Sequence, residues 1–193
     1  MLRINEIFNT IQCEGKYTGT PSTFIRLQGC KVGCGWCDTK DSWNTGTRLY
    51  SPEYIAELAT LEHVVITGGE PCEQDLSELT AALSGKFRTL ETSGTAEISG
   101  DFEWVTVSPK IGMPGGLVVL DSAILRADEI KFPVGKASDI DALKSLLSRA
   151  KEGVIISLQP LSQSKAATEL CIKHCIANGW NLSIQVHKYI EIP

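Results

Sequence analysis

The sequence predicts an α/β protein built as a reduced, open parallel β/α barrel with about six core strands. Short apolar, β-branched runs recur along the chain, and such runs are typical of strands. The expected strands cover residues 22–27, 63–67, 88–91, 104–107, 129–132, 154–158 and 182–186. Helical patterns between some of them predict helices over residues 52–60, 75–84, 138–150 and 165–178. This alternation is typical of parallel β/α units.

The expected strands are apolar over nearly their whole length, which indicates a parallel sheet covered on both faces. A complete eight-unit barrel needs about 250 residues, and this chain has 193. We therefore expect some units to be missing and the barrel to stay open. Because the chain has the length of one domain and no convincing linker, we expect residues 1–193 to form a single domain.

Two helix ends carry recognisable signals. Ser51 precedes Pro52, the order expected for an N-cap followed by proline at the first helical position. Gly179 follows the last expected helix, where a glycine commonly ends a helix. These residues set the expected start of the helix at 52 and the end of the helix at 178.

The composition is that of an ordinary globular protein, with 42% hydrophobic and 21% charged residues. The formal net charge is -5 and the lysines and arginines are scattered, which argues against a nucleic-acid partner. No apolar run is long enough to cross a bilayer, and the polar first residues do not resemble a signal peptide. We therefore expect a cytoplasmic protein without a membrane partner.

The carboxyl ends of the expected strands are polar or glycine-rich. In parallel α/β barrels, functional residues gather at this end of the strands. We therefore expect five segments to line one shared cavity, namely residues 28–30, 67–71, 91–94, 108–110 and 159–160.

Seven cysteines are an odd number for a disulfide framework, and the expected compartment keeps thiols reduced. Cys30, Cys34 and Cys37 form a CxxxCxxC pattern directly after an expected strand. Structural zinc prefers four protein ligands, and four cysteines close an ordinary iron–sulfur cluster. Three cysteines thus leave one metal position open. The alternatives are a zinc-binding module that borrows a fourth ligand, or three reduced core thiols.

The CxxxCxxC pattern, with the aromatic Trp36 before its last cysteine, resembles the radical S-adenosylmethionine superfamily. The resemblance implies a fold of that type and a [4Fe-4S] cluster on Cys30, Cys34 and Cys37, with one open iron that binds S-adenosylmethionine and an electron from the cluster that cleaves it. Residues 67–71, Thr-Gly-Gly-Glu-Pro, resemble the superfamily segment whose glycine backbone and acid receive the methionine amino group. Hydroxyls at 93 and 108 suit a ribose, although such residues could equally cap helices. The expected cofactor contacts are Trp36, Gly69, Glu70, Ser93, Ser108, Pro109, Lys110, Gln159, Pro160, Leu161 and Ser162.

Four further segments, 11–21, 24–30, 37–39 and 185–193, closely resemble the 7-carboxy-7-deazaguanine synthase family. That resemblance implies ring contraction of 6-carboxy-5,6,7,8-tetrahydropterin to 7-carboxy-7-deazaguanine with loss of ammonia, a step toward queuosine. A deoxyadenosyl radical would abstract the hydrogen on C6 of the pterin. The resemblance also implies Mg²⁺ on the substrate carboxylate, an electron donor such as flavodoxin, and a homodimer.

Carried onto this sequence, the family pattern implies a role for Thr39 as a magnesium ligand through its hard hydroxyl oxygen. Arg26 offers a planar fork for a carboxylate, and Gln12 can read an amide-like pterin edge. The family commonly has glycine where this chain has Cys13, whose thiol could narrow the pocket. The full set of expected substrate contacts is Ile11, Gln12, Cys13, Glu14, Arg26, Thr67, His187 and the terminal Pro193.

The remaining cysteines and the CxxxCxxC pattern also allow other interpretations. Cys72, Cys171 and Cys175 are expected to be packing residues, as is common for buried thiols, although Cys171, His174 and Cys175 form a CxxHC pattern on a helix. The main rival enzyme is an activating enzyme that makes a glycyl radical on a partner protein. Such an enzyme needs a docking surface for a protein instead of a closed pterin pocket.

Overall fold

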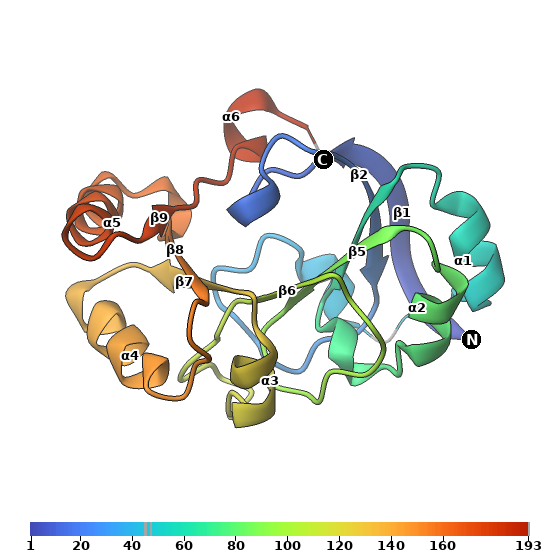
Figure 1. The fold of residues 1–193 in the computed structure, drawn as a ribbon, viewed down its shortest axis with the longest axis horizontal. Helices are drawn as coiled ribbons and strands as arrows, with labels where there is room; N and C mark the ends of the chain where they lie inside the picture. Colours follow the sequence, from blue (N-terminus) through green and yellow to red (C-terminus); the bar gives the residue numbers. More distant parts are fainter. Residues whose placement is uncertain (45, 47, 193) are drawn as a thin grey trace.

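In the computed structural model, which describes residues 1–44, 46 and 48–192, one curved sheet holds nine strands in the order β3-β1-β2-β4-β5-β6-β7-β8-β9. Figure 1 shows helices α1 to α5 along the outer side of this arc. The two edges of the sheet do not pair, so the barrel is open. The strands are β1 (Leu2–Ile11), β2 (Pro21–Leu27), β3 (Leu49–Tyr50), β4 (His63–Gly68), β5 (Phe87–Thr92), β6 (Trp104–Val107), β7 (Glu129–Val134), β8 (Ile155–Pro160) and β9 (Asn181–Leu182).

The helices follow the strands as crossover connections or lie at chain turns. They are α1 (Pro52–Leu58), α2 (Ser77–Ala82), α3 (Asp121–Arg126), α4 (Ala137–Leu147), α5 (Lys165–Asn178) and α6 (His187–Ile190), with 3₁₀ helices η1 (Gly15–Tyr17), η2 (Lys40–Trp43), η3 (Pro71–Glu73) and η4 (Leu161–Gln163). Within the described ranges, no helix has the length and apolar character needed to cross a membrane.

The predicted fold class is confirmed. Six strands of four or more residues, β2 and β4 to β8, pair in parallel in the described part of the chain. Both helix-end predictions also hold: the Ser51 hydroxyl accepts a hydrogen bond from the Tyr54 amide at 3.2 Å, and Gly179 ends α5 with φ of 68°.

One expected strand was wrong, and strands β1 and β3, helices α3 and α6 and the 3₁₀ helices were not predicted. Strand β9 holds only Asn181 and Leu182, because the chain then leaves the sheet and Ser183 bonds to the Gly15 amide at 2.9 Å. The first strand, β1, pairs antiparallel with β2 and was missed, as were the short helices α3 and α6.

The core lies between the outer face of the sheet and the helices. Along neighbouring strands, Ile25, Ile66, Leu90 and Val105 stand in register and are almost completely buried. Successive side chains of a strand point to opposite faces. The residue that follows each of these therefore points to the inner, concave face, and all four of those residues are polar: Arg26, Thr67, Glu91 and Thr106.

The seam of the open barrel is filled by the chain itself near its base. The Lys16 amide donates to the Glu129 carboxylate at 3.1 Å, and the Tyr17 ring lies 5.1–5.3 Å from the rings of His63, Phe87 and Trp104. Gly15 has φ of +66°, and a Cβ atom there would stand 2.7 Å from Glu129 Oε2. Glycine is therefore required for this segment to enter the barrel.

Glu70 joins the carboxyl ends of β4 and β5. Its carboxylate is buried and accepts hydrogen bonds from Thr92 Oγ1 at 2.6 Å, the Ser93 amide at 2.8 Å and the Cys72 amide at 3.1 Å, and also from the Ser93 hydroxyl. Each of these donors would lose its acceptor if the carboxylate were removed. Glu70 thus fixes the relative position of two strand ends.

The Glu70→Gln variant is expected to lower the free energy of unfolding by about 1–3 kcal/mol, because the amide NH₂ faces buried donors. Urea denaturation of the metal-free full chain measures this change. Glu57→Gln on the exposed surface of α1 is the matched control and should change stability by less than about 0.5 kcal/mol. Equal stability of the two variants would contradict the bracing role of Glu70.

Candidate active site

A cavity of about 490 Å³ opens at the carboxyl ends of the parallel strands. As expected, each of the five strand-end segments contributes to its lining: residues lining it include Cys30 after β2, Thr67 and Gly69 at β4, Glu91 to Ser93 at β5, Ser108 and Lys110 after β6, and Gln159 in β8. The cavity is large enough for a small-molecule ligand.

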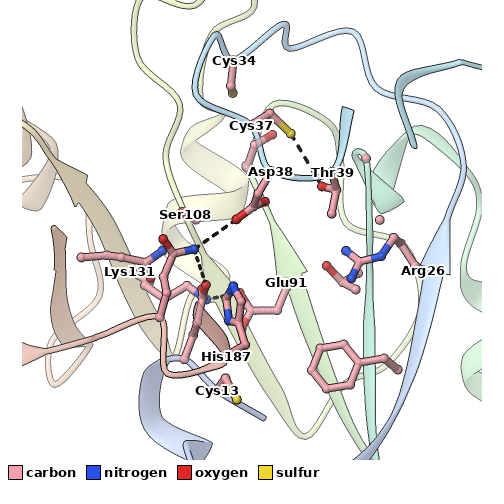
Figure 2. A pocket seen from close by; sticks show the side chains of 18 of the residues that line it. Cys13, Arg26, Cys34, Cys37, Asp38, Thr39, Glu91, Ser108, Lys131 and His187 are labelled. Atoms are coloured by element: carbon pink, nitrogen blue, oxygen red, sulfur yellow. Dashed lines mark hydrogen bonds and ion pairs between the residues drawn. The ribbon is translucent and has the colours of Figure 1, made fainter. Parts of the chain in front are cut away.

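Three cysteines from the loop after β2 lie at one end of this cavity. Cys30, Cys34 and Cys37 all line it, and Figure 2 shows Cys34 and Cys37 on the side opposite Cys13. The loop is tightened by a hydrogen bond from the Cys37 amide to the Cys34 carbonyl at 3.0 Å. Cys37 Sγ lies 3.6 Å from the Thr39 hydroxyl. All seven cysteines are free, and burial raises the pKa of the Cys30 and Cys34 thiols.

Two glycines leave room for the cysteine loop at its walls. A Cβ atom on Gly69 would stand 2.4 Å from the Gly29 carbonyl oxygen, and one on Gly115 would stand 1.9 Å from the Lys31 carbonyl oxygen. The Gly115 amide also donates to the Val32 carbonyl at 3.1 Å. The loop is therefore clamped between two backbone segments that only glycine permits.

The donor set of this loop fits a four-iron cluster. Across the described residues, no three Cys, His, Asp or Glu side chains lie close enough together to hold one metal ion. A four-iron cluster makes a different demand, because each cysteine binds a different iron and the sulfurs surround a bulky centre. Three thiols facing one cavity from one glycine-rich loop meet that demand.

The wall of the cavity formed by β1 and β2 carries one cation and two aromatic rings. Arg26 Nε donates to Glu6 Oε1 at 2.7 Å, and its guanidinium lies 5.8 Å from the centre of the Phe8 ring. Phe8 stacks on Phe24 with ring centres 5.4 Å apart. These residues all line the cavity, so this wall offers a positive charge beside flat apolar surfaces.

A buried ammonium joins two carboxylates inside the cavity. Lys131 Nζ lies 2.8 Å from Glu14 Oε2 and 2.8 Å from Glu91 Oε2, and only 5% of the Lys131 side chain is exposed. Gln12 Nε2 donates to the second oxygen of Glu91 at 3.4 Å. The ammonium of Lys131 on β7 thus pairs with two carboxylates, Glu14 from the loop after β1 and Glu91 from β5.

The two carboxylates differ in their proton affinity. Burial disfavours the charged form of Glu14, but the attraction of Lys131 and hydrogen bonds from Lys131 and Gln185 outweigh it and lower the pKa to about 2. For Glu91, burial dominates and the nearby Glu14 adds repulsion, so its pKa rises to about 7 despite Lys131. The two carboxylates raise the pKa of Lys131, while burial lowers the pKa of Lys110.

The C-terminal segment returns to the cavity and completes one side. The Val186 amide donates to the Cys13 carbonyl at 3.1 Å, and Figure 2 shows His187 beside Cys13. Gln185, His187, Lys188 and Ile192 line the cavity. The first and last parts of the chain therefore meet at the same end of the site.

Most of the predicted site residues come together in this one cavity. Those that line it are Ile11, Gln12, Cys13, Glu14, Arg26, Cys30, Cys34, Trp36, Cys37, Thr39, Thr67, Gly69, Ser93, Ser108, Lys110, Gln159, Leu161, Ser162 and His187. Three predicted cofactor contacts, Glu70, Pro109 and Pro160, lie outside the lining. Pro193 lies outside the described residues.

Several lining residues were not predicted from the sequence. They include Glu6, Phe8, Phe24, Asp38, Lys131, Gln185 and Lys188. Lys131 carried a usable signal, because a lysine in the middle of the apolar run 129–134 has no simple packing explanation. The other cysteines behave as expected: Cys72, Cys171 and Cys175 belong to the hydrophobic core.

Lys110 and Trp36 connect the cysteine loop to the loop after β6. Lys110 Nζ lies 5.2 Å from the centre of the Trp36 ring and donates to the Ser108 hydroxyl at 2.6 Å. A buried ammonium over an aromatic face is a favourable contact. It places a positive charge at the cysteine end of the cavity.

Comparison with known proteins identifies close relatives along the whole chain, although no family model matches it. The 7-carboxy-7-deazaguanine synthase of Escherichia coli K12 is 47% identical, with 98% of both chains covered. The synthase of Buchnera aphidicola is 44% identical over 98% of both chains, and that of Flavobacterium psychrophilum is 36% identical over the full length of this chain.

A solved structure agrees with these sequences. The crystal structure of QueE from Escherichia coli superposes with a TM-score of 0.88 and 46% sequence identity, covering 95% of this chain and 93% of that chain. The chain therefore belongs to the 7-carboxy-7-deazaguanine synthase family.

Proposed function

We propose that this chain is a 7-carboxy-7-deazaguanine synthase, a radical S-adenosylmethionine lyase that converts 6-carboxy-5,6,7,8-tetrahydropterin to 7-carboxy-7-deazaguanine with loss of ammonia. The product would serve queuosine biosynthesis. Membership of the family supports this assignment. The observation that carries it is that one cavity holds the three-cysteine loop, Arg26, the C-terminal segment and the ion-paired residues Lys131, Glu14 and Glu91, which are called the Lys131 group.

The cysteine end of the cavity is proposed to hold the cluster and the cofactor. Cys30, Cys34 and Cys37 would bind three irons. When bound, the cluster and S-adenosylmethionine supply the one-electron chemistry that starts the reaction. The cofactor would lie along the strand ends against Trp36, Gly69, Ser93, Ser108, Lys110, Gln159, Leu161 and Ser162, all of which line the cavity.

Glu70, Pro109 and Pro160 are proposed to position the loops that bind the cofactor and not to contact the cofactor with their side chains. The Glu70 carboxylate is already occupied by donors from Cys72, Thr92 and Ser93. It would hold the Ser93 loop in place for the cofactor. Pro109 and Pro160 would shape the loops that carry Ser108 and Leu161.

The part of the cavity away from the cysteines, around Arg26 and the segment 11–14, is proposed to bind the pterin. Arg26 would pair with the substrate carboxylate. Among the described contacts, Glu6 binds the guanidinium only through Nε, so the two terminal nitrogens can donate to a carboxylate of the substrate. Gln12, Glu14 and Thr67 would bond to the polar edges of the ring. Ile11, Cys13 and His187 would close the pocket around it.

Magnesium, the electron donor and the assembly are also proposals. Thr39 would give Mg²⁺ a hydroxyl oxygen, and the substrate and waters would complete the octahedral shell that this ion prefers. The family resemblance supports an electron donor such as flavodoxin and a homodimer. Pro193 would be a further substrate contact. Residues 1–193 would form one domain, which the continuous sheet supports.

A small substrate suits this cavity better than a partner protein does. The C-terminal segment and the segment 11–14 close the end of the cavity opposite the cysteines. A glycyl-radical activating enzyme would need that side to admit a protein loop. The family relatives also favour the synthase.

Anaerobic turnover tests the assignment. Reconstituted protein given carboxytetrahydropterin, S-adenosylmethionine, magnesium and a reductant should form 7-carboxy-7-deazaguanine, measured by chromatography and mass spectrometry. Cys34→Ser should abolish product and remove iron, because thiolates hold the cluster. Cys175→Ser, which keeps a donor for the Asn181 carbonyl, is the matched control and should stay active. Cofactor cleavage without this product would instead favour the activating enzyme.

The Gly115→Ala variant should weaken the hold on the cluster, since its Cβ would meet the Lys31 carbonyl oxygen at 1.9 Å. We expect at least about a twofold loss of iron and sulfide per chain and faster bleaching in air, because the loop must shift. Gly35→Ala, in the cysteine loop itself, meets nothing within 4 Å and is the control. Equal iron content in the two variants would show that the clamp does not matter.

The pKa of Glu91 predicts a pH dependence of stability. The folded pKa is about 7 and the ordinary value 4.5, so between these pH values the folded chain keeps a proton that the unfolded chain has lost. Glu91 therefore makes stability fall as pH rises through this window. Glu14 acts in the opposite sense, with stability lost as pH falls from 4.5 toward 2.

The Glu91→Gln variant cannot ionise at this position. Its unfolding free energy relative to the wild type should therefore increase by up to about 3 kcal/mol from pH 5 to pH 8. Urea denaturation of the metal-free full chain at both pH values measures this difference. A difference that stays constant with pH would show that Glu91 is ionised in the folded chain throughout the range.

A further inference from the structure

The C-terminal segment, residues 185–192, is held mainly by polar contacts. Figure 1 shows α6 above the gap between β9 and the β1–β2 pair. The apolar side chains of α6 give little anchorage, because Tyr189 is 62% exposed and Ile190 is 52% exposed, while Val186 and Ile192 are only partly buried. Hydrophobic burial therefore contributes little to its position. The placement of His187 against the cavity must depend on the bonds made by its neighbours.

The Gln185 amide is the centre of these bonds. Its Nε2 donates to Glu14 Oε1 at 2.8 Å and to Asp38 Oδ2 at 3.3 Å, while its Oε1 accepts from Lys188 Nζ at 2.6 Å. The donor side of the amide thus faces two carboxylates and the acceptor side faces an ammonium. The reversed amide would set an oxygen against both carboxylates, so charge fixes this orientation.

Lys188 reaches across to the cysteine loop. Its Nζ lies 3.2 Å from Asp38 Oδ2, and the side chains of Lys188 and Asp38 are 26% and 49% exposed. Asp38 stands between Cys37 and Thr39 in the sequence. Figure 2 shows Asp38 at the middle of the cavity wall, between Cys37 and the Lys131 group. Asp38 thus contacts the C-terminal segment, while its sequence neighbours Cys37 and Thr39 line the cavity near the cysteine loop.

We propose that Gln185 and Lys188 are positioning residues that fasten the C-terminal segment to Asp38. The fastening holds His187 and the loop of Cys37 and Thr39 in one mutual arrangement. Glu14 extends it to Lys131 and Glu91, so the wall around the pterin end is one connected set of charges. The effect on catalysis rests on the proposed function, but the fastening itself does not.

The first test measures the fastening without substrate. Chymotrypsin cleavage after the exposed Tyr189 is followed by mass spectrometry in reconstituted full chain. Lys188→Met should speed this cleavage about fivefold, as loss of a partly exposed ion pair would. Lys188→Arg should restore the wild-type rate. Lys165→Met, which breaks the exposed pair with Glu169 on α5, is the matched control and should leave the rate unchanged.

A double-mutant cycle then tests whether Lys188 acts through Asp38. Asp38→Asn alone should speed cleavage as Lys188→Met does, and the double variant should be no faster than either single variant. Multiplied effects in the double variant, or cleavage of Lys188→Met at the wild-type rate, would overturn the proposal.

Turnover separates positioning from a merely structural role. Lys188→Met should raise the KM for carboxytetrahydropterin about tenfold and change kcat less than about threefold, as expected when a residue shapes the binding wall. An unchanged KM together with faster cleavage would refute the link to the substrate wall. Absence of any product from the wild type would reject the proposed function, while the cleavage rates would still judge the fastening.

Discussion

The site depends on the two-residue period of the parallel strands. Ile25, Ile66 and Leu90 stand in register on the outer face and are buried under the helices. The next residue on each strand, Arg26, Thr67 or Glu91, must then point into the concave face. A shift of one residue in any strand would exchange core and site. The apolar packing that stabilises the sheet is therefore also what aims the polar groups.

Curvature of the sheet brings charges together that a flat sheet would keep apart. Lys131 on β7 meets Glu91 on β5 and Glu14 from the first loop, each at 2.8 Å. One ammonium cannot fully compensate two buried carboxylates, so one acid stays ionised and the pKa of Glu91 rises to about 7. The cavity thereby gains a carboxyl group that changes charge near neutral pH. Buried ion pairs add little to stability, and carboxyl groups with shifted pKa values are typical of functional sites. The group of Lys131, Glu14 and Glu91 is therefore better explained by a functional role than by stabilisation of the fold.

Glycine and the chain ends complete what the sheet leaves open. Gly69 and Gly115 let two backbone segments approach the cysteine loop more closely than any side chain would allow. At the other end, the segment 12–17 and the C-terminal segment fill the seam between the unpaired edges, joined by the bond from Val186 to Cys13. The open barrel is thus closed by loops that also carry site residues. A chain shorter than a complete eight-unit barrel can in this way enclose a small-molecule cavity.

Local chemistry in the sequence was sufficient for the parallel strands β2 and β4 to β8, the helix caps at Ser51 and Gly179, and the cysteine loop, because periodicity, capping and ligand spacing act over a few residues. It also indicated which strand ends would share a cavity. It could not show that residues 183–186 leave the sheet, or that Asp38, Gln185 and Lys188 meet. Asp38 and Gln185 are 147 positions apart in the sequence. Only the tertiary structure decides these contacts, since a hydrogen bond between distant residues needs the rest of the fold to hold both partners within bonding distance.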